Sequence, residues 1–477
     1  MFPSKLKQSL PWLLGTLVLG ALIGSASVAL VCHLHGGETS VHASPYPRET
    51  ARVTFVAAGD VIPHQPVVES AKAHKTDSNH DGWDALFADT ADLFQSADFG
   101  FVNLETPVAP AHSRGSKPFL FDAPVALPQA LKASGVKVVS FANNHVMDQN
   151  WAGFAETRQH LTETGLQFSG TSDTAQTAWQ PIILEKNGLK IGILGMTRWL
   201  NGNRNPEKDD QPHVNFFPYP NESAGGPKSE GGADEAQVLE AVKAARAQCD
   251  FLVLSIHWGI EYAPAPRPED VDLAHKLMDA GASVLVGHHP HVLQPVETYQ
   301  TVDNRNTVIF YSLGNFLSNQ SRTYIDGLMP DKDGEPRQSL IVRFAAIQKD
   351  YGPAGKRVEL GSVGIWPAWQ ENNRNAIQRG QDKDPFIHPV LLDRVIAPLS
   401  AQVDALEKKG SEQGVTGLAP AEKQQFIDLS AQLKALQHQR ELILARTGDE
   451  YVLDPPRLDP SKLAPPKPEP QKPVTQP

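Results

Sequence analysis

The stretch Ser283-Val284-Leu285-Val286-Gly287-His288-His289-Pro290-His291 places three imidazoles directly after a short, mostly apolar run. A run of this length bounded by glycine is typical of a buried strand. Three histidines within four residues are rare in a purely structural role, whereas a metal ion needs several imidazoles close together. We therefore interpret this stretch as a strand that presents metal ligands at its carboxyl end.

Four other strand-like runs end in polar side chains of the same kind. Ligands of open α/β sheets gather in the crevice beyond the carboxyl ends of the strands. Each motif alone has an ordinary explanation, such as a turn at Gly59-Asp60 or a packed pair at His257-Trp258, but their coincidence predicts one site built from five segments. The polar residues are Asp60, Asn103 and Glu105, then Asn143, Asn144 and His145, and finally His257.

The body of the chain alternates apolar runs with helix-like segments, which predicts an α/β layered domain. We expect strands at residues 53–58, 99–104, 136–141, 182–185, 190–196, 251–256, 283–286 and 307–313, with two more at 339–346 and 357–366. Helices are expected at 83–95, 125–134, 151–164, 235–247 and 268–280, and a long surface insertion at 201–232.

The donor types predict the class of metal. Carboxylate and amide oxygens with neutral imidazoles suit Zn, Mn or Fe ions, and the absence of thiolates argues against a soft-metal site. Two such ions need a bridging carboxylate, for which Glu105 or Asp60 is available. The His289-x-His291 spacing would place both rings on one side of an extended segment. Divalent ions activate water as a nucleophile, and His145 could then act as general acid or orient the substrate.

The N-terminus predicts a membrane anchor. Lys5 and Lys7 precede an uncharged, mostly apolar stretch at residues 10–32, which is long enough to cross a bilayer as a helix. The flanking lysines would stay in the cytoplasm, so the bulk of the chain would be extracytoplasmic, at the periplasmic or cell surface. Two alternatives stay open: cleavage of a signal peptide after Ala43, and lipidation of Cys32.

The predicted organisation has seven parts. They are a cytoplasmic segment (1–9), the anchor (10–32), a linker (33–50), the main domain (51–325), a strand-containing extension that completes it (326–390), a helical extension (391–446) and a Pro-rich disordered tail (447–477). Within the helical extension, the apolar positions Phe426, Leu429, Leu433 and Leu436 predict one helix face that packs against a neighbour within the chain.

Charge restricts the partners. The net charge of −11 and the lack of a long basic run argue against a nucleic-acid binder. An acidic polymer would therefore need local help from metal ions or from arginines such as Arg198, Arg204 and Arg267. We also assign Asn143 and Glu261 to substrate binding. The run 311–316 is expected to be a buried strand and turn.

Over residues 52–320 the sequence resembles the bacterial capsule-synthesis, poly-γ-glutamate biosynthesis (CapA-type) family. The resemblance implies a four-layer α/β sandwich of the calcineurin-like metallophosphoesterase type with a dinuclear metal site. The motifs that carry it are Gly59-Asp60, Asn103-Leu104-Glu105-Thr106-Pro107, Ala142-Asn143-Asn144-His145, His257-Trp258-Gly259-Ile260-Glu261-Tyr262, Gly287-His288-His289-Pro290-His291-Val292-Leu293-Gln294 and Tyr311-Ser312-Leu313-Gly314-Asn315-Phe316.

The resemblance also implies residue roles. His145 would be the catalytic imidazole, and Asp60 would serve both catalysis and metal binding. The sequence departs from the broader phosphoesterase pattern, because Ile62 stands where a histidine is usual and Glu105 where an aspartate usually bridges. Gly-His-His-Pro-His replaces Gly-His-x-His, so His288 and His289 compete for one role. The implied ligands are Asp60, Glu105, Asn144, His257, His289 and His291.

Two functions fit these observations. The first is a dinuclear-metal hydrolase that acts on a phosphoester or an amide-linked acidic polymer at the cell surface. The second is a non-hydrolytic, membrane-tethered component of a capsule or poly-γ-glutamate synthesis and export complex, which the helical extension would help to assemble with other proteins.

Overall fold

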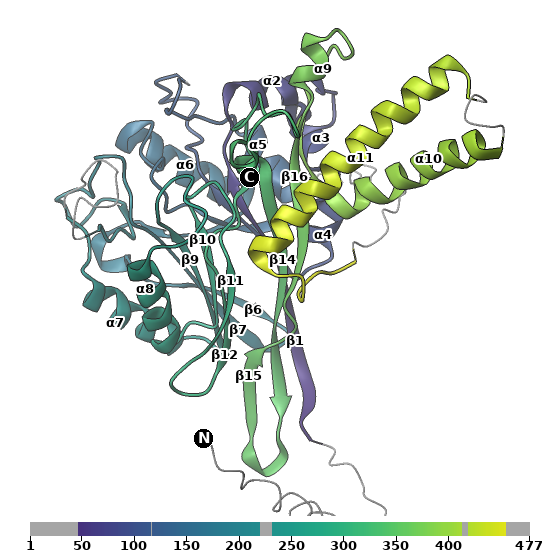
Figure 1. Cartoon of the computed structure of the whole chain (residues 1–477). Coiled ribbons are helices and arrows are strands. Elements are labelled where there is room, and N and C mark those ends of the chain that lie inside the picture. Colours follow the sequence, from purple (N-terminus) through teal and green to yellow (C-terminus); the bar gives the residue numbers. More distant parts are fainter. Residues whose placement is uncertain (1–45, 116, 220–230, 413–417, 455–477) are drawn as a thin grey trace, which may run out of the picture.

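The structure is a computed structural model that describes residues 46–115, 117–219, 231–412 and 418–454 (Figure 1). The predicted anchor, Cys32, Ala43 and the tail beyond residue 454 lie outside these residues. Within the described part, no helix is both long and apolar enough to cross a bilayer.

Two large β-sheets form the centre of the molecule. The first has nine strands in the order β17-β16-β14-β1-β2-β3-β4, with β13 beside β1 and β15 beside β14; strands β1 to β4 of this path run parallel. Its strands are β1 (Arg48–Val61), β2 (Phe99–Leu104), β3 (Val136–Ser140), β4 (Gln167–Ser169), β13 (Asn315–Leu317), β14 (Gln338–Asp350), β15 (Lys356–Leu360), β16 (Gly364–Asn372) and β17 (Ile387–Leu391).

The second sheet has six strands in the order β11-β12-β10-β9-β7-β6, with a parallel centre and an antiparallel strand at each edge. A two-stranded sheet pairs β5 (Thr171–Ser172) with β8 (His213–Val214), and only β8 lies in the region predicted as an insertion, residues 201–232. The strands of the second sheet are β6 (Ile182–Lys186), β7 (Leu189–Thr197), β9 (Phe251–His257), β10 (Val284–His288), β11 (Val296–Gln300) and β12 (Asn306–Phe310).

The two sheets pack face to face through one apolar core. Alternate residues of β1, such as Phe55 and Ala57, point into this core, where Val253 of β9 and Val286 of β10 meet them. Their neighbour Val56 points to the opposite face and packs under helices. This alternation follows from the two-residue period of a strand, and it makes β1 buried on both faces.

Helices cover both outer faces, which gives the layered α/β architecture expected from the sequence (Figure 1). One group of helices packs on the first sheet and a pair packs on the second. The first group is α2 (Gln65–Ala73), α3 (Trp83–Phe87), α4 (Ala91–Gln95), α5 (Ala126–Ala133) and α6 (Asn150–Thr164); the pair is α7 (Glu235–Arg246) and α8 (Pro268–Asp279).

Two C-terminal helices form an antiparallel pair that packs against β14, β16 and β17: α10 (Leu392–Glu412) and α11 (Pro420–Thr447). The short helix α9 (Arg374–Gln378) precedes them, between β16 and β17. Leu436 and Ile443 of α11 enter the core shared with the two sheets, and Leu429 and Leu433 pack beside them. The predicted packing of this helix face within the chain is confirmed for Leu429, Leu433 and Leu436, whereas Phe426 does not belong to this core. The pair covers the part of the first sheet that the second sheet leaves bare.

Several sequence expectations need correction. Residues 83–95 form two short helices, α3 and α4, instead of one. The start of the predicted disordered tail is ordered, because Tyr451 and Leu453 make backbone hydrogen bonds with Ile365 of β16. Residues 357–366 are not one strand: β15 and β16 are separate and pair with different stretches of β14, Ala346–Asp350 and Gln338–Arg343 respectively. The short strands β4, β11, β13 and β17 and the helix α2 were not predicted. β4 and β13 have only three residues each, too few to show a hydrophobic period.

Candidate metal centre

The predicted polar residues converge at the carboxyl ends of strands from both sheets. β1, β2 and β3 contribute from the first sheet, and β9 and β10 from the second. Three groups of ligand atoms lie within 4.8 Å of one another: Glu105 with His257 and His289, Asp60 with Glu105 and His291, and Glu261 with His289 and His291. Glu105 belongs to two of these groups, as a bridging carboxylate would.

Asp60 lies within β1 rather than in a turn after it. Its backbone pairs with Asn315 of β13 and Asn103 of β2. A Cβ atom on the preceding Gly59 would stand 1.8 Å from the carbonyl oxygen of Gly314, so this close approach of two backbones requires glycine. The turn alternative for Gly59-Asp60 is therefore wrong, and the rigid strand fixes the Asp60 carboxylate.

The Asp60 carboxylate is fully buried and surrounded by donors. Asn103 donates from Nδ2 to Oδ1 at 2.8 Å, and the backbone N–H of His289 donates to Oδ2 at 3.3 Å. Nδ1 of His288 lies 3.2 Å from Oδ1 and Nδ1 of His291 lies 3.4 Å from Oδ2. Burial alone would raise the pKa of Asp60, but these two imidazoles outweigh it and hold the pKa well below its usual range.

Glu105 has the opposite environment. Its side chain is fully buried, and neither carboxylate oxygen has a hydrogen-bond partner in the described part of the chain. The nearest imidazole nitrogens are Nε2 of His257 at 3.7 Å and Nε2 of His291 at 3.8 Å. Burial, and then the negative charge of Asp60, raise the pKa of Glu105 well above its usual range. An unpartnered buried carboxylate facing imidazoles fits a divalent cation between them.

The imidazoles of His257 and His289 are neutral, which is the form that binds metals. Burial lowers the pKa of both, to about 3 for His289 and well below the usual range for His257. Nε2 of His257 lies 3.1 Å from Nδ1 of His289 and 2.9 Å from Oδ1 of Asn144. An amide oxygen and two imidazoles thus point at one space.

The segment that carries His289 and His291 is not extended, contrary to expectation. β10 ends at His288, and the next two histidines have φ angles of 96° and 58°. Such positive values are strained for residues other than glycine and cluster at functional sites. The strained turn, and not strand alternation, brings the two rings to 6.0 Å between centroids. His288 instead faces Asp60 and belongs to none of the three ligand groups at this site.

His145 lies beside the cluster and is oriented by a carboxylate. Its Nδ1 is 2.8 Å from Oδ2 of Asp148, which also accepts the backbone N–H of Phe121 at 2.7 Å. The ring of Phe121 packs on the imidazole at 4.4 Å. Asn143 accepts the backbone N–H of His145 and donates to the carbonyl of Leu104, so it braces this loop.

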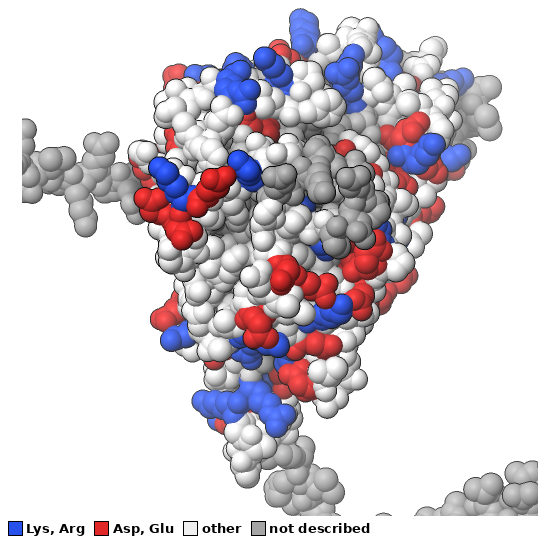
Figure 2. All heavy atoms as spheres, turned by 90° about the vertical axis from the view of Figure 1, so that its left-hand side faces the viewer, with Lys and Arg blue, Asp and Glu red and all other residues white. Residues whose placement is uncertain are grey.

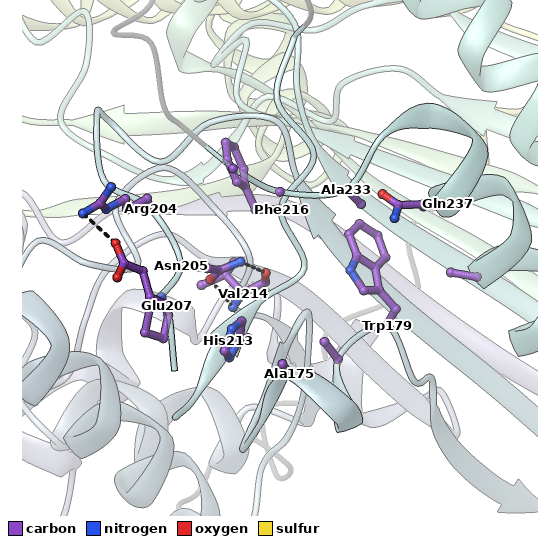
Figure 3. A pocket seen from close by; sticks show the side chains of 15 residues that line it. Ala175, Trp179, Arg204, Asn205, Glu207, His213, Val214, Phe216, Ala233 and Gln237 are labelled. Carbon is purple, nitrogen blue, oxygen red and sulfur yellow. Dashed lines mark hydrogen bonds and ion pairs between the residues drawn. The ribbon is translucent and has the colours of Figure 1, made fainter. Parts of the chain in front are cut away.

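The arginines assigned to substrate are engaged elsewhere. Arg267 makes two hydrogen bonds of 2.8 Å with Asp270, and its guanidinium stacks on Tyr219 at 4.1 Å. Arg198 lies on the same ring at 3.7 Å and donates to the carbonyl of Pro218. Arg204 forms an ion pair with Glu207 at a cavity of about 710 Å³, which Trp179 and Gln237 also line (Figure 3).

The sequence predicted only a structural role for Asn315, as part of a buried strand and turn. Its Oδ1 is 3.1 Å from Nδ1 of His291, and its Nδ2 donates to the backbone carbonyl of the same histidine. The run 311–316 is buried, as predicted, but Asn315 also orients a candidate ligand. Asn103 had been noticed as a polar strand-end residue without a role. The available signal for Asp148 was its place three residues after His145.

Comparison with known proteins gives the family. Residues 54–320 match the family of the bacterial capsule synthesis protein PGA_cap. The chain belongs to this family.

Individual members of the family are distant relatives. The chain is 27% identical to "Capsule biosynthesis protein CapA" of Bacillus anthracis, over 58% of this chain and 62% of the relative. It is 31% identical to "PGA biosynthesis protein CapA" of Bacillus subtilis, over 51% of this chain and 59% of the relative. The matches thus span about six tenths of these relatives. The calcineurin-like phosphoesterase YfkN of Bacillus subtilis is similar over 66% of this chain and 90% of that chain, at 12% identity and a TM-score of 0.35, too low for further argument.

Proposed function

We propose that this PGA_cap protein is a metal-dependent hydrolase that cleaves a bond in an acidic surface polymer or a phosphoester outside the cytoplasm, while anchored to the membrane through residues 10–32. The observation that carries the proposal is Glu105, whose two buried oxygens lack hydrogen-bond partners in the described structure while imidazoles from two strands face them. Relatives named for capsule and PGA biosynthesis support the choice of an acidic polymer.

The residues fit two divalent ions that share Glu105. Asp60 and His291 would hold one ion with Glu105, and His257, His289 and Asn144 would hold the other. When bound, Mn, Fe or Zn would polarise the scissile group and lower the pKa of a water molecule. Glu261 is exposed and its carboxylate lies beside His289 and His291, so it can bind either an ion or a substrate group.

His145 would hold the proton that the leaving group needs. Asp148 accepts a hydrogen bond from Nδ1 and thereby keeps that nitrogen protonated, which leaves Nε2 as the atom that exchanges a proton with the substrate. Phe121 packs on the ring and restricts its rotation. Because the imidazole is only 7% exposed, water has little access to the transferred proton.

The first test measures metal content and hydrolysis together. The purified chain is loaded separately with Mn, Fe and Zn, and the same is done with a His289→Ala/His291→Ala double variant and with His160→Ala as control, since His160 lies on α6 away from the cluster. We expect near-stoichiometric metal and hydrolysis of γ-linked glutamate polymer or a phosphoester in the unaltered chain and the control, and loss of both in the double variant.

Two other outcomes would contradict the proposal, one in whole and one in part. A folded chain that binds none of the three metals would overturn the proposal and leave a non-hydrolytic polymer-binding component as its replacement. Metal binding without turnover on any substrate would overturn the hydrolase only. No observation on α10 and α11 favours the assembly role, because their apolar faces pack against this chain.

A further inference from the structure

A second hollow lies beside the metal centre. Its volume is about 300 Å³, and three segments enclose it: the turn after β1, the loop after β2 and the loop after β13. It is lined by His64, Pro118, Phe119, Asn319, Gln320, Ser321, Arg322 and Thr323.

Hydrogen bonds connect this hollow to the candidate ligands. Gln320 accepts a hydrogen bond from Nδ2 of Asn315 at 2.9 Å, and Asn315 in turn contacts His291. On the other side, the ring of Phe121 lies between His64, at 5.2 Å, and His145, at 4.4 Å. Gln320 and Asn315 thus separate the hollow from the candidate ligand His291, and the ring of Phe121 separates it from His145.

Arg322 carries the only formal charge among the lining residues apart from the imidazole of His64. Its side chain is exposed, and no carboxylate of the described ranges forms an ion pair with it. Gln320, Ser321 and Thr323 add side-chain amide and hydroxyl donors to the same wall. A free guanidinium with neutral donors around it is complementary to an oxyanion, which it can bind through two parallel hydrogen bonds.

Phe119 forms an apolar rim above this charge. Its side chain is 84% exposed, and its φ of 63° is strained for a bulky residue. Exposure of an aromatic ring in a strained backbone is the kind of feature found at ligand clamps. Because Phe119 and Arg322 line the same hollow, the ring would pack on the methylene groups of a flexible acidic chain whose charge Arg322 binds.

We propose that this hollow is a second subsite, in which Arg322 binds an oxyanion of the substrate, a carboxylate or a phosphate, one or more units away from the bond at the metal centre. This inference rests on the proposed function and specifies its substrate: a chain of repeated anionic groups. A molecule with a single anion would occupy one subsite only.

The test compares Arg322→Ala, Arg322→Lys and Arg343→Ala in the full chain. Arg343 is the matched control, because it is also exposed, lies on β14 and likewise has no ion pair in the described structure. Binding of a γ-linked glutamate hexamer and of tripolyphosphate is measured by calorimetry in low salt. We expect Arg322→Ala to weaken binding of one probe roughly tenfold, Arg322→Lys to weaken it less, and Arg343→Ala to leave it unchanged.

The probe that loses affinity identifies the anion: the hexamer points to carboxylates and tripolyphosphate to phosphates. Equal binding by Arg322→Ala and Arg343→Ala would overturn the subsite, and so would an unaltered chain that binds neither probe. Binding that depends on Arg322 in a chain without hydrolytic activity would retain the subsite while rejecting the hydrolase.

Discussion

At the scale of single residues, Glu105 decides between a metal centre and an ordinary buried cluster. Because its pKa is raised in the folded protein, a metal-free chain loses stability as the pH rises above the unfolded value of 4.5 toward the folded pKa. Glu105→Gln should therefore stabilise the metal-free chain at neutral pH by about 1–3 kcal/mol, the usual cost of an unsatisfied buried polar group.

The measurement is thermal unfolding in chelator at neutral pH and at pH values near 4.5, with and without added metal. Glu163→Gln on the exposed face of α6 serves as control. Metal should stabilise the unaltered chain and not the Glu105→Gln variant. A variant that is destabilised in chelator would mean that Glu105 has a structural partner after all.

The buried imidazole of His64 should make the folded protein less stable in mild acid. Burial, and then the positive potential of His291, lower its pKa from 6.5 to about 4. The unfolded chain therefore binds a proton first as the pH falls, and stability is lost between about pH 6.5 and pH 4, up to about 3 kcal/mol. Denaturant unfolding of His64→Gln should show a flatter pH profile over this window, whereas His74→Gln at the end of α2 should follow the unaltered chain.

Asn315 shows what sequence could not provide at this scale. The residue types at the strand ends were enough to predict that Asp60, Glu105, His257, His289 and His291 would meet. The strained φ angles of His289 and His291 have no local sequence signal, since only the surrounding fold imposes them. Asn315 sits in a run that reads as buried strand and turn, so its contact with His291, 24 residues away in the sequence, could not be foreseen.

Asn315→Ala should therefore affect both metal binding and stability. The side chain supports His291 and also donates to the carbonyl of Pro336 at 2.9 Å. Loss of such an outer partner typically weakens metal affinity by about 10–100-fold. We expect this loss in a metal titration, together with a lower unfolding temperature; a change in stability alone would restrict Asn315 to the structural role that the sequence suggested.

At the scale of elements, the packing of α11 on the sheets depends on the apolar side chains of its buried face. Leu436 is 6% exposed in the core shared with the sheets, whereas Ile427 on the same helix is 58% exposed. Leu436→Ala should lower the free energy of unfolding by about 2–5 kcal/mol, and Ile427→Ala should change it little. Urea unfolding followed by circular dichroism measures both. Equal small effects would mean that α10 and α11 unfold separately from the sheets.

Most helices and strands could be predicted from the sequence, and the elements that were missed show where a sequence pattern is not enough. The apolar runs predicted the place of the core strands, although β1 and β14 extend several residues further, and α10 and α11 form the helical extension predicted at 391–446. The break between β15 and β16 was missed, because only three residues, 361–363, separate the two strands and the chain changes only the part of β14 with which it pairs. The face-to-face packing of the two sheets was not readable from periodicity and came only from the family resemblance.

At the scale of the whole molecule, the distribution of surface charge restricts how an anionic partner could bind. Figure 2 shows acidic and basic side chains interspersed over the face that carries α7 and α8, without a continuous basic surface there. An anionic polymer would therefore depend on local features such as the metal ions and Arg322. That nucleic acid is not a partner stays a prediction.

The long strand β1 connects the predicted anchor to the site. It begins at Arg48, at the foot of a ribbon formed with β14 and β15, and Asp60 lies near its other end (Figure 1). Twelve residue steps of extended chain span about 40 Å. The metal centre therefore lies about 40 Å along β1 from the first described strand residue, which is the end of the strand nearer in sequence to the predicted anchor.

Removal of residues 1–45 tests this arrangement, because every described element begins after that point. We expect the full chain in the membrane fraction, released only by detergent, and the shortened chain in the soluble fraction with the same unfolding temperature. Mass analysis of the mature full chain separates the alternatives: an N-terminus at Ser44 would show cleavage after Ala43, and a lipid mass lost in Cys32→Ser would show lipidation. An intact full chain that stays soluble without detergent would contradict the anchor, and with it the extracytoplasmic site that the proposed polymer substrate requires.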